Sequence, residues 1–111
     1  MTEIADTFEE LGVPKSAAKV LDYMRSVSVC TPLEIQEGTE LSQPVVSTAV
    51  KYLRERGWIV MNTTKHGKGR PRHDYSLKSI DVIVNELESG IHNKISLLRN
   101  NLDIIKEILK A

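Results

Sequence analysis

The chain has 111 residues and no formal net charge, and Phe, Trp and Tyr together make up 5% of it. This length indicates one domain, with room for an appended element. A single cysteine excludes an intramolecular disulfide and a cysteine-rich zinc site, and the lack of a signal peptide or of an apolar run of about 18 residues predicts a soluble, cytoplasmic protein without a membrane partner.

Charged side chains are unevenly distributed along the chain. Residues 1–50 carry eight Asp or Glu and three Lys or Arg, whereas residues 51–72 carry seven Lys or Arg and one Glu. An ordinary solvated surface does not require such segregation of charge. A compact basic segment is typical of a surface that binds a polyanion such as nucleic acid.

Two helices are predicted in the first quarter of the chain. Residues 2–11 form a short amphipathic pattern that Gly12 ends, and residues 14–26 form a second pattern with Pro14 in its first turn. Residues 27–30 are a β-prone run, which we expect to be a short edge strand. Ile4, Phe8 and Leu11 make the apolar stripe of the first helix. In the second helix, the side chains expected to face the core are Ala17, Val20, Leu21 and Met24.

A third helix is predicted to begin after Thr31. Thr31 and Glu34 have the spacing of a capping box, in which each side chain binds the backbone N–H of the other residue. Gly38 is expected to permit a sharp turn, because glycine adopts backbone angles that other residues avoid. The apolar side chains expected to face the core are Leu33 and Ile35.

A fourth helix follows this turn. Ser42 is a good N-cap, because its hydroxyl accepts from a free backbone N–H, and Pro44 in the first turn loses no hydrogen bond. Val46, Val50 and Leu53 share one face, and Gly57 ends the helix. This pattern indicates a helix-turn-helix, whose second helix enters the DNA major groove, although an ordinary pair of core helices would also show it.

A β-hairpin is predicted directly after the fourth helix. Residues 58–64 and 73–77 alternate as strands, with Ile59 and Met61 of the first strand facing the core. The loop between them, residues 65–72, holds two glycines, a proline and four Lys or Arg, which is typical of a basic wing. A phosphate-cradling loop of a nucleotide-binding enzyme is the alternative, but the P-loop motif is absent and a strand follows instead of a helix.

The last part of the chain, residues 79–111, is predicted to be helical. Its aliphatic side chains recur every three or four residues as a heptad-like seam, with one additional four-residue step around Ser89 and Gly90 where a kink or break is plausible. The seam is too long for so small a domain to bury, so we expect it to pair with a second copy, although folding back onto its own domain is an alternative. The expected dimerisation residues are Ile80, Val84, Leu87, Ile91, Ile95, Leu98, Leu102, Ile105 and Leu109.

Three segments carry a resemblance to a known family. They are the Leu-Gly turn and Ala-Lys-Val helix of residues 11–21, the helix-turn-helix core of residues 41–59, and Gly69-Arg-Pro-Arg72 with the strand that follows. Together they resemble the winged-helix transcriptional regulators of the TrmB-like and MarR-like groups that are common in archaea. The sequence departs from TrmB proteins proper, since it carries no large C-terminal sugar-binding domain, and it lacks the paired cysteines of ArsR-type metal sensors.

The resemblance implies a fold and an organisation. It implies an α+β, mostly α fold, in which residues 1–78 form a winged helix-turn-helix domain with a two-stranded wing and residues 79–111 form a long C-terminal dimerisation helix. It further implies a homodimeric, sequence-specific regulator of transcription that binds double-stranded DNA, with the recognition helix in the major groove and the basic wing on the minor groove and backbone.

Particular residues follow as candidates for DNA contact. Gln43 has the amide that reads adenine, Lys51 and Arg54 suit phosphates, and Arg70 beside Pro71 suits the minor groove. Arg56 has either a DNA contact or an internal carboxylate partner. The full set of candidates is Thr31, Ser42, Gln43, Pro44, Ser47, Thr48, Lys51, Arg54, Lys65, Lys68, Arg70 and Arg72.

Other functional classes receive less support. A winged-helix module for protein–protein contacts in a transcription-related assembly is the main alternative, because fold alone does not define function. The three histidines, His66, His73 and His92, form no catalytic or metal-ligand spacing, so we expect no enzyme activity, no metal and no cofactor. Cys30 is either a thiol sensor or a buried, inert cysteine, and the sequence names no small-molecule effector.

Overall fold

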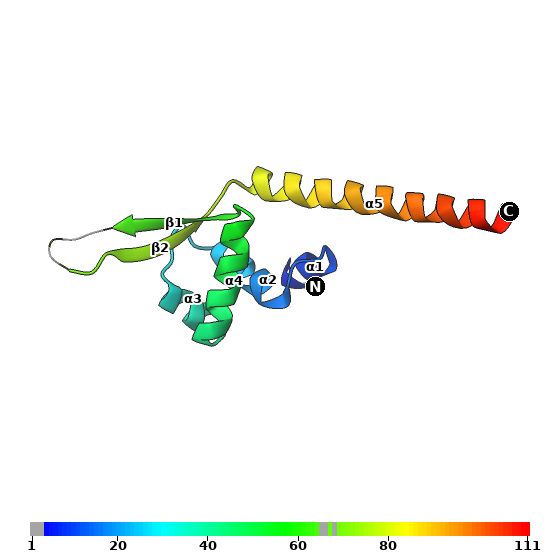
Figure 1. Cartoon of the computed structure of the whole chain (residues 1–111). Coiled ribbons are helices and arrows are strands. Elements are labelled where there is room, and N and C mark those ends of the chain that lie inside the picture. Colours follow the sequence, from blue (N-terminus) through cyan, green and yellow to red (C-terminus); the bar gives the residue numbers. More distant parts are fainter. Residues whose placement is uncertain (1–3, 65–66, 68) are drawn as a thin grey trace. The chain divides into compact units, whose positions relative to one another are not determined.

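The computed structural model describes residues 4–64, 67 and 69–111 of the chain (Figure 1). The chain divides into two compact units, residues 1–80, here called the N-terminal unit, and residues 81–111, of which all but the last belong to one long helix. The elements in chain order are α1 (Ile4–Glu10), α2 (Lys15–Met24), α3 (Pro32–Thr39), α4 (Gln43–Glu55), β1 (Ile59–Thr64), β2 (Arg72–Leu77) and α5 (Ile80–Lys110).

The first two helices pack against each other, but not through all the side chains that the sequence indicated. The five buried residues of α2 include all four predicted ones, together with Ala18. In α1 the buried residue is Ala5. Ile4 is 38% exposed and Leu11, just after the helix, is 44% exposed, so the predicted apolar stripe is not the buried face of this helix. Helical periodicity favoured the larger side chains, but a short helix that lies close to its neighbour buries the small one.

The capping box at the start of α3 is confirmed. The backbone N–H of Thr31 donates to Glu34 Oε1 at 3.0 Å, and the N–H of Glu34 donates to the Thr31 hydroxyl at 3.2 Å. Ile35 is fully buried as predicted, but Leu33 is 61% exposed, so its predicted core position is wrong.

Gly38 does not form the turn that was predicted for it. It lies inside α3, and a Cβ at this position would lie 2.5 Å from Cδ2 of Tyr23. Glycine is therefore required here because the α2 aromatic ring lies against the α3 backbone. The turn itself is made by Glu40, which adopts the left-handed conformation with a φ of 61°.

Helix α4 begins and ends as predicted, although its N-cap differs in detail. Ser42 occupies the N-cap position, but its side chain makes no capping hydrogen bond. Gly57 follows the helix with a φ of 74°, as expected of a glycine after a helix end. The buried face of the helix consists of Val46, Ala49, Val50 and Leu53.

The hairpin is the predicted two-stranded wing. Strands β1 and β2 pair antiparallel from Ile59 opposite Leu77 to Thr64 opposite Arg72. The predicted edge strand before α3 is reduced to a single bridge, in which Cys30 and Tyr75 exchange backbone hydrogen bonds of 2.8 and 2.9 Å. With the hairpin directly after the second helix of a helix-turn-helix, the N-terminal unit has a winged helix-turn-helix fold, and the chain is α+β and mostly α.

Helix α5 is a single element of 31 residues. It continues through Ser89 and Gly90 without interruption, so the kink or break considered there is not present (Figure 1). One glycine costs a helix only about 1 kcal/mol, which a long run of good helix formers tolerates. Among its residues only Ile83 is buried. In the described part of the chain, no helix is both long and apolar enough to span a membrane.

Candidate nucleic-acid interface

A polar and basic stripe runs along the exposed face of α4. Gln43, Ser47, Lys51 and Arg54 are all exposed and follow one another at spacings of four, four and three residues, which places them along one side of the helix. Gln43 Nε2 donates to the Ser47 hydroxyl at 3.3 Å, so these two side chains are already oriented together. The stripe lies beside the buried face and therefore points away from the core.

The remaining α4 candidates are also at the surface. Ser42, Pro44 and Thr48 are exposed at the N-terminal end of the helix. The Thr48 hydroxyl donates to the Pro44 carbonyl oxygen at 3.1 Å, which leaves its oxygen free to accept a further hydrogen bond.

A shallow groove of about 220 Å³ adjoins the stripe. It lies where α4, the start of α3 and strand β2 meet, and the side chains of Lys51 and Arg54 stand at its edge. Exposed Lys and Arg side chains are the groups that neutralise backbone phosphates in protein–DNA complexes. The groove is lined by Pro32, Val46, Ser47, Val50, Lys51, Arg54 and Tyr75.

The wing contributes two described basic candidates. Arg70 and Arg72 are exposed, and Arg72 begins β2, whereas the candidates Lys65 and Lys68 lie outside the described residues. A hairpin with exposed basic side chains thus follows α4 directly in the chain, as expected of a wing.

The start of α3 differs from an open anion site. Both the N–H and the hydroxyl of Thr31 donate to Glu34 Oε1 at 3.0 Å. These two hydrogen bonds lower the pKa of Glu34, with a smaller contribution from the positive charge of Arg72, so the carboxylate is charged at neutral pH. A carboxylate at this helix end repels phosphate, which argues against a phosphate contact at Thr31.

Arg56 has a role that the sequence did not reveal. Its guanidinium lies over the Tyr52 ring at 4.7 Å and over the Trp58 ring at 5.5 Å from the ring centres. The two rings themselves meet edge to face at 6.4 Å. Arg56 thus helps to hold the end of α4 against the start of the hairpin through cation–π contacts. The sequence signal for this contact was the spacing of Tyr52, four residues before Arg56, and Trp58, two residues after it.

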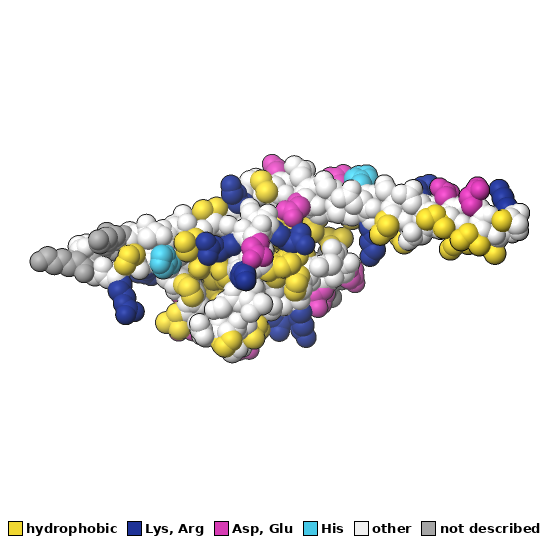
Figure 2. Space-filling model, viewed as in Figure 1, with side chains coloured by type: hydrophobic (Ala, Val, Ile, Leu, Met, Phe, Trp, Pro, Cys, Tyr) yellow, Lys and Arg dark blue, Asp and Glu magenta, His cyan; other side chains and the backbone are white. Residues whose placement is uncertain are grey.

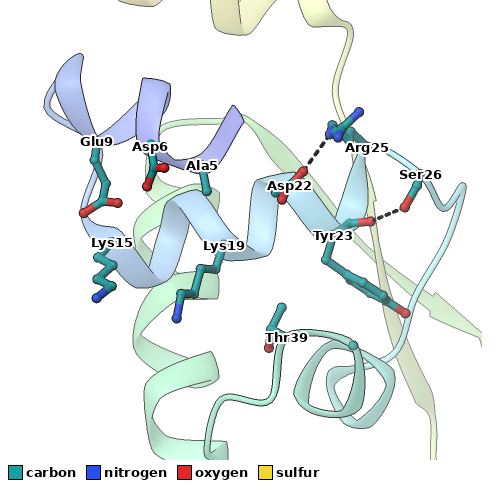
Figure 3. A pocket seen from close by; sticks show the side chains of 11 residues that line it. Ala5, Asp6, Glu9, Lys15, Lys19, Asp22, Tyr23, Arg25, Ser26 and Thr39 are labelled. Carbon is teal, nitrogen blue, oxygen red and sulfur yellow. Dashed lines mark hydrogen bonds and ion pairs between the residues drawn. The ribbon is translucent and has the colours of Figure 1, made fainter. Parts of the chain in front are cut away.

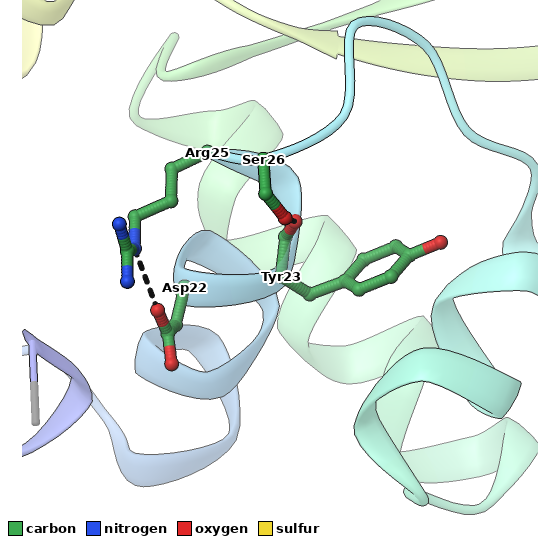
Figure 4. A network of polar contacts seen from close by, with 4 residues as sticks. All are labelled: Asp22, Tyr23, Arg25 and Ser26. Atoms are coloured by element: carbon green, nitrogen blue, oxygen red, sulfur yellow. Dashed lines mark hydrogen bonds and ion pairs between the residues drawn. The ribbon is translucent and has the colours of Figure 1, made fainter.

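A second hollow of about 400 Å³ lies among α1, α2 and α3 (Figure 3). Charges of both signs surround it, and Arg25 Nε forms an ion pair with Asp22 Oδ1 at 2.7 Å (Figure 4). Its side chains are mostly exposed, and no buried polar group is found among the described residues to orient a ligand. The same residues contain no cluster of His, Cys, Asp or Glu suited to a metal ion.

The surface of α5 is apolar along one side. The predicted seam is exposed over most of its length, from 44% at Ile95 to 79% at Leu109. Figure 2 shows hydrophobic side chains along one edge of the C-terminal half of the helix. Leu97, Ile104 and Ile108 add a neighbouring row of exposed apolar side chains that the predicted seam does not include. Such a surface is unusual for a helix that remains alone in water.

Comparisons with known proteins establish the fold class. No protein-family model matches the chain, and no curated protein matches its sequence. The structure is similar to a possible transcriptional regulator from Methanosarcina mazei Go1 (TM-score 0.77, 16% identity, 92% of this chain and 88% of that chain). It is also similar to the ST1889 protein from Sulfolobus tokodaii (TM-score 0.68, 21% identity, 88% and 99%) and to NMB1585, a MarR family regulator from Neisseria meningitidis (TM-score 0.53, 18% identity, 96% and 82%).

These likenesses confirm the winged-helix architecture that residues 8–77 indicated. The neighbours whose names state a function are described as transcriptional regulators. The likeness extends to regulators of the MarR and PadR type, while membership of the TrmB-like group stays a prediction.

Proposed function

We propose that this protein is a DNA-binding regulator of transcription. The observation that carries the proposal is the polar and basic stripe of α4, which faces away from the core beside a groove edged by Lys51 and Arg54. A core-packing helix would not need this arrangement. The basic wing that follows in the chain extends the same chemistry.

The proposed roles divide between reading bases and holding the backbone. Gln43 reads adenine in the major groove, and Ser47 and Thr48 contact base edges or a thymine methyl. Lys51 and Arg54 neutralise phosphates along the groove. The candidates of the wing enter the minor groove or follow the backbone, with Arg70 as the inserted side chain.

The proposal includes a homodimer formed through α5. The exposed aliphatic seam supports it, because burying that seam against a second copy would remove a large apolar surface from water. Two winged units would then contact half-sites about one helical turn apart on a pseudo-palindrome. A cytoplasmic location accords with this role.

A protein-interaction module is less well supported. Such a module would present an apolar patch on the winged unit. Among the described residues, however, 12 of the 18 exposed large hydrophobic side chains belong to α5 and six are scattered over the N-terminal unit. The apolar surface is therefore concentrated on the proposed dimer helix.

Binding of the full chain to selected genomic DNA tests the proposal. We expect binding at low salt whose affinity falls with salt. Lys51→Ala and Arg70→Ala should each reduce the slope of log affinity against log salt by about 0.9 for every lost contact, and so by about 1.8 for a dimer that loses the contact in both winged units. Gln43→Ala should instead relax the preference at one base pair, by about 1–3 kcal/mol.

Lys19→Ala is the matched control, because Lys19 is exposed on α2 at the second hollow. It should leave the salt slope unchanged. Absence of binding at low salt, or equal effects of Lys19→Ala and Lys51→Ala, would contradict the assignment of this surface to DNA. Recovery of one stoichiometric protein partner by a chain without DNA affinity would favour the interaction module.

A further inference from the structure

The charges of α5 are segregated between its two halves. Residues 80–90 carry three acidic side chains and no Lys or Arg, whereas residues 91–110 carry four Lys or Arg and two acidic side chains. The helix dipole favours this order only within the first and last turns. It does not account for Glu88, Lys94 and Arg99, which lie in the interior of the helix.

These interior charges flank the aliphatic seam. Asp81, Glu88, Arg99 and Lys106 each follow a seam residue directly, so they lie on the same side of the seam. Lys94 lies on the other side, directly before Ile95. Flanking positions of this kind decide the orientation of paired helices, because their charges meet across the interface.

A parallel pair of α5 helices places like charges together. In a parallel dimer, a residue directly before a seam position on one helix faces a residue directly after a seam position on the other helix. The residue on the other helix lies closer to the C-terminus. Lys94 of each copy would then face Arg99 of the other copy. This repulsion would occur twice in every dimer.

We propose that α5 pairs with α5 of a second copy in the antiparallel direction. The proposal rests on the homodimer of the proposed function and specifies its geometry. In an antiparallel pair, residues that flank the same side of the seam face each other, so Glu88 faces Arg99 of the second copy and Asp81 faces its Lys106. Each attraction occurs twice, so four attractions outweigh the one like-charge contact, that of Lys94 with Lys94 of the second copy near the two-fold axis. The acidic half of each helix lies along the basic half of the other.

The seam fits the same alignment. When Leu87 lies at the same height along the helix axis as Leu98 of the second copy, the other seam residues also lie opposite one another, with offsets of no more than one residue. The central pair, Ile91 with Ile95, brackets the irregular four-residue step, which therefore lies at the two-fold axis. The aligned pairs are Ile80 with Ile105, Val84 with Leu102, Leu87 with Leu98, and Ile91 with Ile95.

Charge reversal distinguishes the two orientations. Arg99→Glu should raise the dimer dissociation constant roughly tenfold at low salt, because two exposed attractions become two repulsions. Adding Glu88→Arg should restore the wild-type constant. In a parallel dimer Arg99→Glu would instead relieve the repulsion by Lys94 and tighten the dimer. Sedimentation equilibrium measures these constants, and Glu107→Lys, on the side of α5 away from the seam, is the control.

Cysteine cross-linking provides a second measurement, with Cys30→Ala removing the natural thiol. Leu87→Cys and Leu98→Cys proteins should form disulfides when mixed, but neither should link to itself. Self-linking of each variant would show a parallel dimer and overturn the inference while the proposed homodimer stands. A monomer at all concentrations would overturn both, and the separate DNA-binding measurement would still decide the role of α4.

Discussion

The N-terminal unit and α5 use the same kind of side chain in opposite ways. In the N-terminal unit, Leu21, Ile35 and Leu53 recur on helical faces and are at most 2% exposed. In α5, Leu98 and Ile105 recur just as regularly and are 58% and 52% exposed. Aliphatic periodicity therefore identifies a face that must be covered, but it does not reveal what covers it. In one region other elements of the same unit supply the cover, while in the other we propose that a second copy does.

The largest expected effect comes from truncating a leucine in each region. Leu53→Ala should lower the free energy of unfolding of the N-terminal unit by about 3 kcal/mol, because it leaves a cavity at a position with no exposure. Leu98→Ala should act through the dimer, so its effect should depend on protein concentration. Urea unfolding at several protein concentrations measures both effects.

Leu33→Ala is the control for these truncations, because Leu33 is 61% exposed on α3. It should change the free energy of unfolding by less than about 0.5 kcal/mol. If Leu98→Ala lowered the free energy of unfolding as Leu53→Ala does, by the same amount at every protein concentration, a second copy would not be what covers the α5 seam.

Replacing the two helical glycines should change the free energy of unfolding by smaller amounts, and the two changes should have opposite signs. Gly38→Ala should destabilise by about 1–2 kcal/mol, because the overlap of the new methyl group with Tyr23 outweighs the helix-propensity gain of alanine. Gly90→Ala should stabilise α5 by about 1 kcal/mol, since a Cβ there meets no atom within 4 Å.

Thermal unfolding monitored by circular dichroism measures both glycine variants. Replacing Tyr23 with alanine in the Gly38→Ala protein should remove the clash, so that the alanine at position 38 becomes neutral or favourable. Stabilisation by Gly38→Ala alone would show that the ring moves aside without loss, and that α2 and α3 do not need this close approach.

The smallest expected effect concerns the capping box. Thr31→Ala should lower the free energy of unfolding by about 1 kcal/mol at pH 7. The pKa of Glu34 is lowered in the folded chain from its usual 4.5, so the hydrogen bonds that its carboxylate accepts from Thr31 stabilise the folded chain at pH values above 4.5. This contribution is lost as the pH falls through the lowered pKa. Urea unfolding at pH 7 and below pH 4 should therefore show the difference from wild type shrinking in acid.

Ser28→Ala serves as the comparison for this pH effect, because Ser28 is exposed ahead of the Cys30 bridge. Its effect should be small and the same at both pH values. A Thr31→Ala effect that persisted in acid would show that the hydroxyl, independently of the Glu34 carboxylate, supplies most of the cap.

Features that depend on a few neighbouring residues were predictable from the sequence. The capping box of Thr31 and Glu34 and the left-handed Gly57 are set by local hydrogen bonding and backbone sterics. The buried faces of α2 and α4 followed from helical spacing. The exposure of the α4 candidates followed from the same spacing, because a helix with one buried face presents the rest to solvent.

Features that depend on distant parts of the chain were missed. Gly38 was assigned to a turn because nothing near it in sequence indicates that the Tyr23 ring occupies the space of its side chain. The closeness of α1 to α2, which buries Ala5, is likewise a tertiary property. The partner of Arg56 could not be predicted from sequence spacing alone, because it depends on how Tyr52 and Trp58 meet at the end of α4.

The bridge between Cys30 and Tyr75 has a practical consequence. The thiol is 1% exposed, and burial, aided by the Glu34 and Asp74 carboxylates, raises the pKa of Cys30 to about 11. Only the thiolate reacts with alkylating reagents, and about one thiol in a thousand would be ionised at pH 8. Burial and the raised pKa both slow alkylation in the closed structure, so separation of the wing from the segment before α3 should speed it. The rate of Cys30 alkylation therefore reports how often the wing opens. The natural cysteine serves as the probe, so no substitution has to be introduced.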